Sequence, residues 1–407
     1  MIKKVNILAI VAYLFLALLS PGLAQAGSGL KILDTSDEVD FPFKLSFSLS
    51  AESDVNITDI RLYYTVDQAG FAQVTSEVFI EFTPATSVEA KWTWDMRKTG
   101  GIPSGSTVYY WWMLEDANGK KLETAPLRTQ FDDTRYSWHS LTRDRVTIYW
   151  YDGDKSFAQE LMVAAQQALA RLFENTGAHL EEPVKIYVYT SAQDLRGAMV
   201  YPQDWTGGVA FTRFGIIAIG IAPDILDWGK RAVAHELTHL VIHQMTLNPY
   251  NDLPTWLNEG LAMYTEGTLE PGFATYLNTA IAEDNLISVR SLSSPFSAYA
   301  GESYLSYAQS YSLVEFLISN YGQGEMLELL NTFKQGSSYD EALFRVYAFD
   351  MDSLNTLWRD YATEQFQPKV ITKAVMPLPL IGVLAALATG LLLGFSLFME
   401  SWVWRRG

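Results

Sequence analysis

The stretch RAVAHELTHLVIHQM, residues 231–245, holds three of the chain's five histidines around Glu236. Residues four apart on an α-helix differ by about 40° in azimuth and about 6 Å in height, so His235 and His239 share one face and suit a single metal ion. His243 lies about 12 Å along the axis from His235 and about 80° around it, whereas zinc ligands each sit about 2 Å from the metal. We therefore interpret His243 as a structural residue or a neighbour of the ligands.

A third ligand has to come from another segment, and Glu259 is the candidate. It follows Pro254 in LPTWLNEGLAMYTEG, residues 253–267, where a new helix is expected to begin. Its neighbours are small and apolar, so a paired acid is more natural there than a solvated one. Two histidines, one glutamate and an open position form the catalytic type of Zn²⁺ site. A buried polar cluster without metal is the alternative.

The bulk composition narrows the class of protein. The chain has 407 residues, 49% hydrophobic and 18% charged, which is enough for two domains with cores. Its formal net charge of -17 comes without a basic stripe, so we expect no nucleic-acid partner. There is no cysteine, which excludes disulfides and thiol chemistry and leaves His, Asp and Glu as metal ligands.

The N-terminal end predicts export. Residues 1–26 place Lys3 and Lys4 before an apolar run of about 15 residues and a small-residue cleavage signal, Ala24-Gln25-Ala26, as in a signal peptide. An uncleaved N-terminal anchor is the alternative.

The C-terminal end predicts a membrane anchor. Residues 374–399 carry no charge and leave about 20 apolar residues for one bilayer crossing, and residues 400–407 form a tail whose arginines favour the cytoplasmic side. A buried core helix is the alternative. We expect a single-pass protein of the cell membrane with its catalytic domain outside, on a prokaryotic cell surface, because an exported chain without cysteine suits that setting.

The segment after the signal peptide predicts an antiparallel β-sandwich over residues 27–135. Apolar residues alternate in FPFKLSFSLSAE, residues 41–52, as in Phe43, Leu45, Phe47 and Leu49, and ITDIRLYYTVD, residues 57–67, is a second strand. Asn118-Gly119 predicts a type I′ hairpin, which needs positive φ at both residues. The architecture resembles an immunoglobulin or fibronectin type III module.

An α+β domain is predicted over residues 140–367. RVTIYWYD and VKIYVYTS are expected strands, and an amphipathic helix between them should end at Gly177. GVAFTRFGIIAIGIAP, residues 208–223, is a long strand or a pair of strands, and the chain from Trp228 is mostly helical. The expected fold class is therefore α+β.

HELTH followed by NEGLA resembles the gluzincin zinc metallopeptidases, most closely the peptidase MA family, over about residues 145–367. The resemblance implies a thermolysin-like α+β metallopeptidase domain with Zn²⁺ held by His235, His239 and Glu259. It also implies that Glu236 acts as general base on the zinc-bound water, whose pKa the metal lowers to about 7. Met263 departs from the thermolysin pattern, which has an acid at that position, so another residue such as Glu266 must orient a ligating histidine.

The resemblance further implies a hydroxyl or imidazole donor for the developing oxyanion. Tyr304, Tyr307 and Tyr311 share one helix face, as packed core aromatics also do. Tyr307 precedes a Gln-Ser pair, as in related sequences, and is our candidate. Residues 207–220 suit an edge strand that aligns an extended peptide, and a plain hairpin is equally consistent.

The leading hypothesis is a membrane-anchored extracytoplasmic zinc metallopeptidase that acts on peptides or proteins. No GxMEN-like signature precedes HELTH, which favours an endopeptidase over an aminopeptidase. The alternative is a membrane-anchored binding or adhesion module with a vestigial or structural metal site. An intramembrane protease is disfavoured because Lys230 and Arg231 flank the histidine helix.

Overall fold

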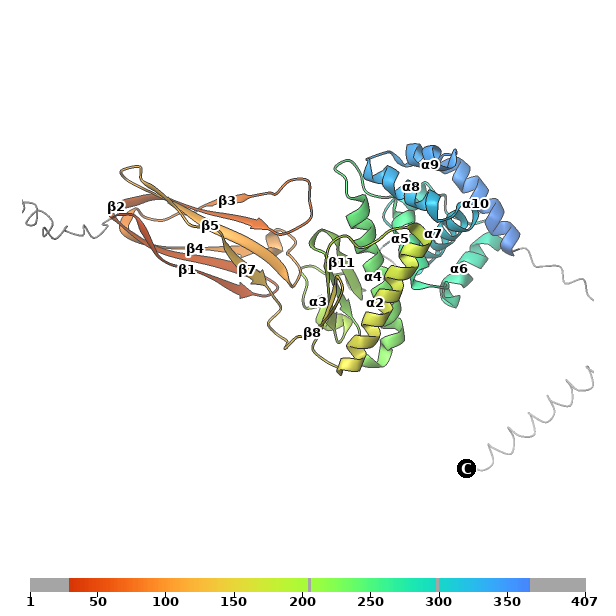
Figure 1. Cartoon of the computed structure of the whole chain (residues 1–407), viewed down its shortest axis with the longest axis horizontal. Helices are drawn as coiled ribbons and strands as arrows, with labels where there is room; N and C mark the ends of the chain where they lie inside the picture. The colour runs from red at the N-terminus through yellow and green to blue at the C-terminus, as the bar shows by residue number, and fades with distance from the viewer. Residues whose placement is uncertain (1–28, 204–205, 298–299, 367–407) are drawn as a thin grey trace, which may run out of the picture.

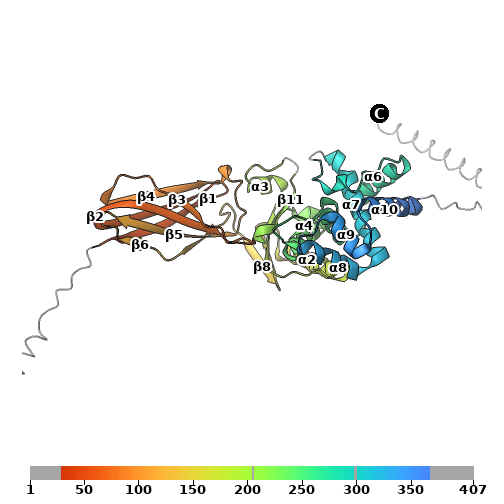
Figure 2. The same cartoon turned by 90° about the horizontal axis from the view of Figure 1, so that it is seen from above.

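The computed structural model describes residues 29–203, 206–297 and 300–366. A β-rich N-terminal part, a central mixed sheet and a helical C-terminal part follow one another along the long axis, and the two perpendicular views agree on this order (Figures 1 and 2). The chain is thus of mixed α+β class, with strands first and helices last, as the sequence predicts.

The N-terminal part is one antiparallel sheet of seven strands that folds over on itself. The strands are β1 (Lys31–Asp40), β2 (Lys44–Val66), β3 (Ser76–Phe79), β4 (Ala85–Asp95), β5 (Ser106–Asp116), β6 (Lys121–Glu123) and β7 (Leu127–Phe131), with a short helix η1 (Met96–Lys98). β2 pairs with β1 and β4 in its first half and with β3 and β5 in its second half. The two halves face each other, because the rings of Phe47 and Tyr110 lie 4.6 Å apart.

The first strands of this sheet differ from the prediction in two details. The two strands expected between residues 41 and 67 are one strand, β2, whose pairing shifts register between Glu52 and Ile57. Phe43 was expected to share the buried face of Leu45, but it precedes β2 and is 43% exposed. Phe41 is buried instead.

The hairpin at Asn118-Gly119 is present, and the turn type predicted for it is wrong. β5 and β6 pair across it, but Gly119 has a positive φ of 78° and Asn118 has none. The Asp116 carboxylate accepts hydrogen bonds from the backbone N–H groups of Asn118 and Lys120, and its carbonyl accepts one from Gly119. These bonds stabilise a wider turn in which only glycine needs the left-handed region.

The central sheet has five strands in the order β11-β12-β10-β9-β8. They are β8 (His139–Arg143), β9 (Val146–Trp150), β10 (Val184–Tyr189), β11 (Gly208–Phe211) and β12 (Ile216–Gly220). β9, β10 and β12 are parallel, and both edge strands are antiparallel to their neighbours. The stretch 208–220 is therefore a pair of strands, and β8 is an additional edge strand beside β9 that the sequence did not predict.

Each face of the central sheet is covered by a different part of the chain. Ile186 and Val188 of β10 belong to a core with the helices α2 (Lys155–Thr176) and α4 (Leu226–Thr246). Tyr187 and Tyr189 alternate with them and belong to the same core as the N-terminal sheet. The short helix α3 (Ala192–Arg196) contributes Leu195 to that second core. α2 ends at Gly177 in the left-handed conformation, as predicted.

Polar contacts tie the two sheets together at this junction. The Asp133 side chain is fully buried and accepts hydrogen bonds from Arg135 and from the Tyr189 hydroxyl. The Lys185 ammonium donates to the carbonyl of Gly105, whose missing side chain leaves room for Tyr187. The N-terminal sheet is thus part of the structural support of the central one.

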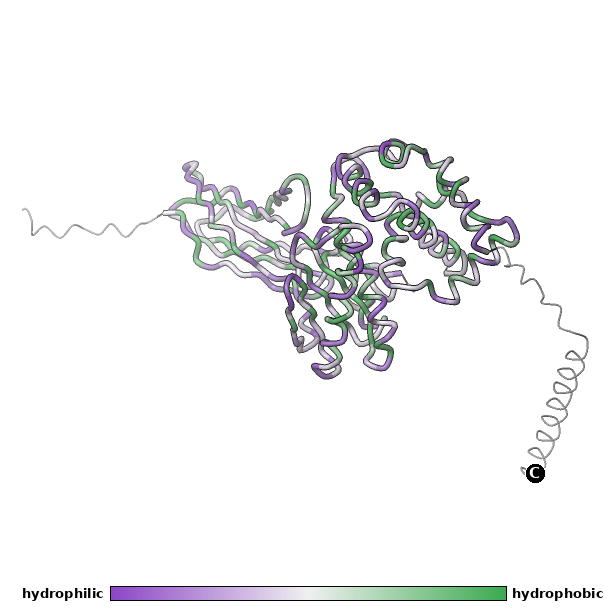
Figure 3. The backbone as a smooth tube through the Cα atoms, turned by 45° about the vertical axis from the view of Figure 1, so that its right-hand side comes forward, coloured by the Kyte–Doolittle hydropathy of each residue, from purple (hydrophilic) through white to green (hydrophobic). Residues whose placement is uncertain are grey.

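The remainder of the described chain is helical. Its helices are α5 (Thr255–Glu266), α6 (Pro271–Ala282), η4 (Ser291–Ser293), α7 (Ala300–Tyr321), α8 (Gln323–Lys334), α9 (Tyr339–Tyr347) and α10 (Met351–Phe366). Two short helices lie earlier in the chain, η2 (Thr212–Phe214) between β11 and β12 and η3 (Pro223–Ile225) before α4. Hydrophobic and hydrophilic segments alternate along the helices in Figure 3, as expected when one side of each helix is buried. Their core is continuous from Val241 of α4 to Trp358 of α10.

No helix within the described ranges is long and apolar enough to cross a membrane. The predicted signal peptide, 1–26, the predicted span, 374–399, and the tail, 400–407, lie outside the described residues.

Candidate metal centre and active-site cleft

Helix α4 presents His235 and His239 on one face, as the spacing predicts. The opposite face is anchored in the core by residues that include Val233, Leu237 and Leu240. The two imidazole rings are 4.8 Å apart between centroids and nearly perpendicular. One side of the helix therefore fixes the histidines while their ring edges turn toward a partly buried space.

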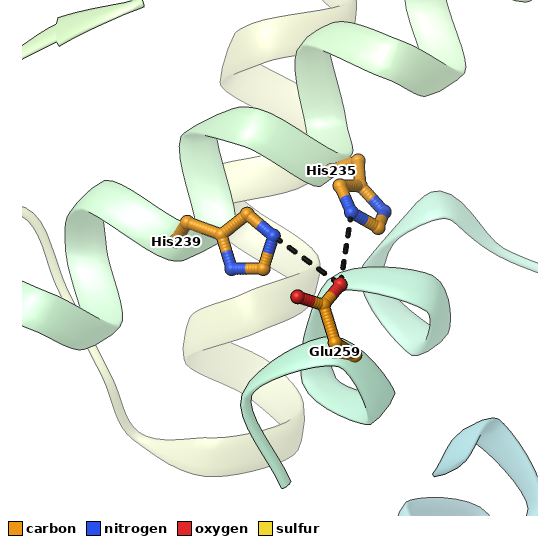
Figure 4. A group of neighbouring side chains, drawn as sticks. All are labelled: His235, His239 and Glu259. Atoms are coloured by element: carbon orange, nitrogen blue, oxygen red, sulfur yellow. Dashed lines mark ion pairs between the residues drawn. The ribbon is translucent and has the colours of Figure 1, made fainter. Parts of the chain in front are cut away.

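Helix α5 brings Glu259 to the same point. Its Oε2 atom lies 3.5 Å from His235 Nε2 and 3.6 Å from His239 Nε2, and Figure 4 shows the carboxylate turned toward both rings. One ligand atom from each of the three residues lies within 4.8 Å of the others. The structure thus brings together the three residues that the sequence predicted as ligands.

The turn between α4 and α5 is held by one side chain. The Asn248 amide donates hydrogen bonds to the carbonyls of Thr246, Asn251 and Phe333. These bonds join the end of α4 to the end of α8 and set where α5 can begin. Asn248 therefore helps to determine the position of Glu259 relative to the histidines.

His243 is not a member of the group, in agreement with the helical geometry. It lies one turn beyond His239, and burial lowers its pKa. Its Nε2 atom is buried, with no hydrogen-bond partner among the described residues. It also lines a cavity of about 600 Å³ beside the metal group.

The outer nitrogen of each histidine has an acceptor. His235 Nδ1 lies 2.8 Å from Glu266 Oε1. Glu266 therefore orients His235, which the apolar side chain of Met263 cannot do. His239 Nδ1 lies 3.2 Å from Asn258 Oδ1. Sequence reasoning missed Asn258, although it directly precedes Glu259 in the NEGLA stretch.

The contacts at Nδ1 orient the Nε2 atoms of both histidines. A histidine that donates from Nδ1 has its lone pair on Nε2, so both Nε2 lone pairs face the Glu259 carboxylate. Glu259 Oε2 lies 3.5 and 3.6 Å from the two Nε2 atoms, which is too far for good hydrogen bonds. These electron-rich atoms repel one another unless a cation lies among them. The donor set of two imidazoles and one carboxylate fits Zn²⁺.

The pKa shifts of Glu259 and His235 also result from the close approach of these charged and polar groups. Burial by itself raises the pKa of Glu259, but the imidazoles of His239 and His235 lower it below its ordinary value. Burial by itself lowers the pKa of His235, but Glu259 and Glu266 raise it well above its ordinary value. In the absence of metal, a proton on His235 thus supplies the positive charge that the cluster requires.

Glu236 lines the same cavity as His235 and lies beside the edge strand β11. Burial raises the pKa of its carboxyl, which accepts a hydrogen bond from the backbone N–H of Ala210. A Cβ on Gly208 would lie 2.9 Å from Glu236 Oε1, so the glycine leaves room for the carboxylate beside the strand. Glu236 is therefore held at the strand, next to the proposed ligands and outside their group.

The metal group lies between two cavities. One of about 600 Å³ is lined by His239, Glu259 and Tyr307 among others, and one of about 240 Å³ by His235, Glu236 and Tyr307. Tyr307 borders both, and burial together with the nearby charges of Glu259 and Glu236 raises the pKa of its hydroxyl. A cleft thus extends to both sides of the group.

The other tyrosines of α7 are placed differently. Tyr304 is 39% exposed and packs against Phe273 and Tyr276. Tyr311 is buried against Tyr264. Gln309 is fully buried and bonds both backbone groups of Ile287, which fixes α7 and so the place of Tyr307.

Comparison with known families agrees with this geometry. The sequence profile of the Peptidase MA superfamily matches residues 164–364, which include α4, α5 and α7. This part of the chain is similar to the Peptidase MA superfamily. No curated protein matches the sequence significantly.

Several solved structures are similar to the chain at low identity. They include an M1 zinc metallopeptidase from Deinococcus radiodurans, with 12% identity over 81% of this chain and 93% of that chain, at a TM-score of 0.35. A variant of a two-domain M1 zinc metallopeptidase bound to L-arginine has 12% identity over 82% and 94%, at a TM-score of 0.36. OgpA from Akkermansia muciniphila has 12% identity over 25% of this chain, at a TM-score of 0.20, and only 28% of the OgpA chain is covered.

Replacing Glu266 by alanine should weaken zinc binding to this site by about 10- to 100-fold, because His235 loses the acceptor that orients it. Competition with a zinc-chelating dye measures the affinity. Glu270→Ala is the matched control, since Glu270 pairs with Arg231, as Glu266 does, and is not bonded to His235. Equal zinc affinity in the two variants would contradict this role.

Proposed function

We propose that this chain is a zinc-dependent endopeptidase, anchored in the cell membrane, with its catalytic domain outside the cytoplasm. The observation that carries the proposal is the convergence of His235, His239 and Glu259 beside Glu236 in a cleft open on both sides. The match of residues 164–364 to the Peptidase MA superfamily supports a peptide or protein substrate.

In this proposal His235, His239 and Glu259 hold Zn²⁺, oriented by Glu266 and Asn258. When bound, Zn²⁺ supplies a Lewis acid that polarises the scissile carbonyl and makes water more acidic. The cluster meets the requirements of such an ion, with two imidazoles and one carboxylate in a partly buried setting, and the bound ion would replace the proton on His235.

Glu236 is the proposed general base. Its carboxylate takes a proton from the attacking water at one oxygen and later passes it to the leaving amine, so one group serves both steps. The Ala210 N–H stabilises the charged carboxylate of Glu236 before it accepts the proton. Burial favours the neutral carboxyl that holds the proton until it is passed on. The carboxylate is thus suited to both protonation states.

Tyr307 is the proposed donor to the developing oxyanion. It borders both cavities at the metal group, and burial keeps its hydroxyl protonated. A donor already in place stabilises charge that appears only in the transition state.

The acids of the smaller cavity favour an endopeptidase over an aminopeptidase. An enzyme that binds a free amino terminus needs an unpaired acid close to the metal. In the smaller cavity Glu266 is bonded to His235 and Arg231, and Glu270 is paired with Arg231. The edge strand β11 borders the cleft through Gly208 and suits pairing with an extended peptide that continues in both directions.

Replacing Glu236 by glutamine should lower kcat by about 10²- to 10⁴-fold on an unstructured protein substrate, because proton transfer is lost, while the purified protein still contains about one zinc per chain. Cleavage is followed by mass spectrometry and zinc by elemental analysis. Glu160→Gln, on the exposed face of α2, is the control and should remain active. Zinc without turnover on a broad peptide library in the wild type would favour the binding-module alternative.

Replacing Tyr307 by phenylalanine should lower kcat by about 10²- to 10³-fold with little change in KM, because the lost hydroxyl acts in the transition state. Steady-state kinetics on a fluorogenic peptide measures both constants. Tyr304→Phe lies one turn earlier on the same helix, lines the smaller cavity and should keep its kcat. An unaffected Tyr307→Phe variant would exclude this assignment.

The membrane location is tested by truncation after residue 373. The full chain should sediment with the membrane fraction and be degraded by protease added to intact cells, whereas the truncated chain should appear in the medium. Recovery of the full chain in the soluble cytoplasmic fraction would refute the proposed location.

A further inference from the structure

A loop of the N-terminal sheet reaches the active-site cleft. The sandwich loop, residues 67–75, joins β2 to β3 at the end of the N-terminal sheet that faces the central sheet (Figure 1). The backbone N–H of Ala69 donates a hydrogen bond of 2.6 Å to the carbonyl of Arg213, in the turn between β11 and β12. The loop is thus attached directly to the hairpin that borders the proposed catalytic groups.

Phe71 of this loop lines the same cavity as His239 and Glu259. Its side chain is 57% exposed although it is a large aromatic residue. A single exposed apolar residue is common on protein surfaces, but this one forms part of the wall of the cavity that contains the proposed ligands. Its position, rather than its exposure alone, indicates a contact with substrate.

Apolar groups from the helical part of the chain line the same cavity. Phe296 and Pro295, shortly before α7, belong to its wall, and the Phe296 ring packs edge-on against Tyr307 with centroids 5.2 Å apart. Leu253, before α5, and Leu247, after α4, extend this apolar lining. An apolar side chain in this cavity is buried by surfaces from both domains.

The polar lining of the cavity suits a peptide backbone. The side chains of Arg213, Asn251 and Thr255 border the cavity and offer hydrogen-bonding groups. The peptide groups of an extended chain supply both donors and acceptors.

We propose that Phe71 is a specificity-determining residue, which holds a large apolar side chain of an extended peptide on the His239 side of the metal group. The inference rests on the proposed function, because it names the substrate class of that same site. It makes the N-terminal domain part of the substrate-binding cleft. The preferred substrates are then unstructured protein segments that carry a large aliphatic or aromatic residue close to the scissile bond.

The test compares Phe71→Ala with the wild type in the full-length protein. On a peptide with a large apolar residue at the preferred position, kcat/KM should fall about tenfold, mainly through a higher KM, as for the loss of a central aromatic contact. Phe71→Trp should retain most of the activity. Val74→Ala is the matched control, because Val74 is 69% exposed in the same loop and lines only the neighbouring cavity of about 550 Å³.

A double-mutant cycle locates the contact on the substrate. When the large residue of the peptide is replaced by alanine, the difference between wild type and Phe71→Ala should disappear, whereas a replacement elsewhere in the peptide should leave it unchanged. Binding of the same peptides to the Glu236→Gln variant, followed by fluorescence anisotropy, gives the comparison without turnover. Thermal unfolding at an unchanged Tm shows that each variant is folded.

The outcomes separate this inference from the proposed function. If the wild type cleaves peptides, Glu236→Gln does not, and Phe71→Ala equals Val74→Ala on every peptide, the role of Phe71 is refuted and the peptidase stands. If the zinc-loaded wild type cleaves no peptide, both are refuted. A loss in Phe71→Ala that persists on alanine-substituted peptides would also refute the contact, because it would be independent of the substrate side chain.

Discussion

The site depends on the close packing of α5 against α7, because that packing carries the Glu259 carboxylate to the histidines of α4. A Cβ on Gly260, the next residue, would lie 2.4 Å from the backbone carbonyl oxygen of Ser310 on α7. No side chain other than hydrogen fits there, so the glycine permits the helices to approach and leaves Glu259 turned toward α4. A larger residue would force α5 outward and separate the carboxylate from the two imidazoles.

The position of α4 depends in turn on both sides of the central sheet. Its apolar face packs on Ile186 and Val188, while the opposite face of the same strand is covered by the core of the N-terminal sheet. The buried Asp133, bonded by Arg135 and Tyr189, needs partners from both regions, because an unpaired buried carboxylate is strongly unfavourable. Burial and the adjacent Asp133 also raise the pKa of Tyr189, which keeps this donor protonated. The N-terminal domain therefore stabilises the sheet on which the histidine helix rests.

Local sequence patterns predicted the parts of the structure that local chemistry determines. The period of α2 and its glycine stop, the i and i+4 histidines and the exclusion of His243 all follow from helical geometry. The three candidate ligands were predictable, including Glu259, because an acid in an apolar helix requires a partner.

What the sequence did not reveal depends on contacts between distant residues. Phe71 and His239 are 168 positions apart and share one cavity, and no local period indicates this. The continuous strand β2 and the edge strand β8 depend on pairing partners, and the hairpin turn at Gly119 depends on the Asp116 carboxylate. Asn258 was missed because its role follows from the direction of the His239 ring, which only the packed helices define.

The acids around the metal group have different partners. Arg231 pairs with Glu266 and Glu270, whereas Glu259 lies against the two imidazoles. A cation held there couples metal binding to the stability of the α4 and α5 pair. Glu236 is adjacent to His235 in sequence, yet the Ala210 N–H and the space beside Gly208 hold it at β11. A carboxylate bound directly to the metal would lose its basicity, whereas one held a short distance away keeps it. The edge strand thus has two functions in the proposed mechanism, since it keeps the base free to accept a proton and aligns the peptide whose bond is cleaved.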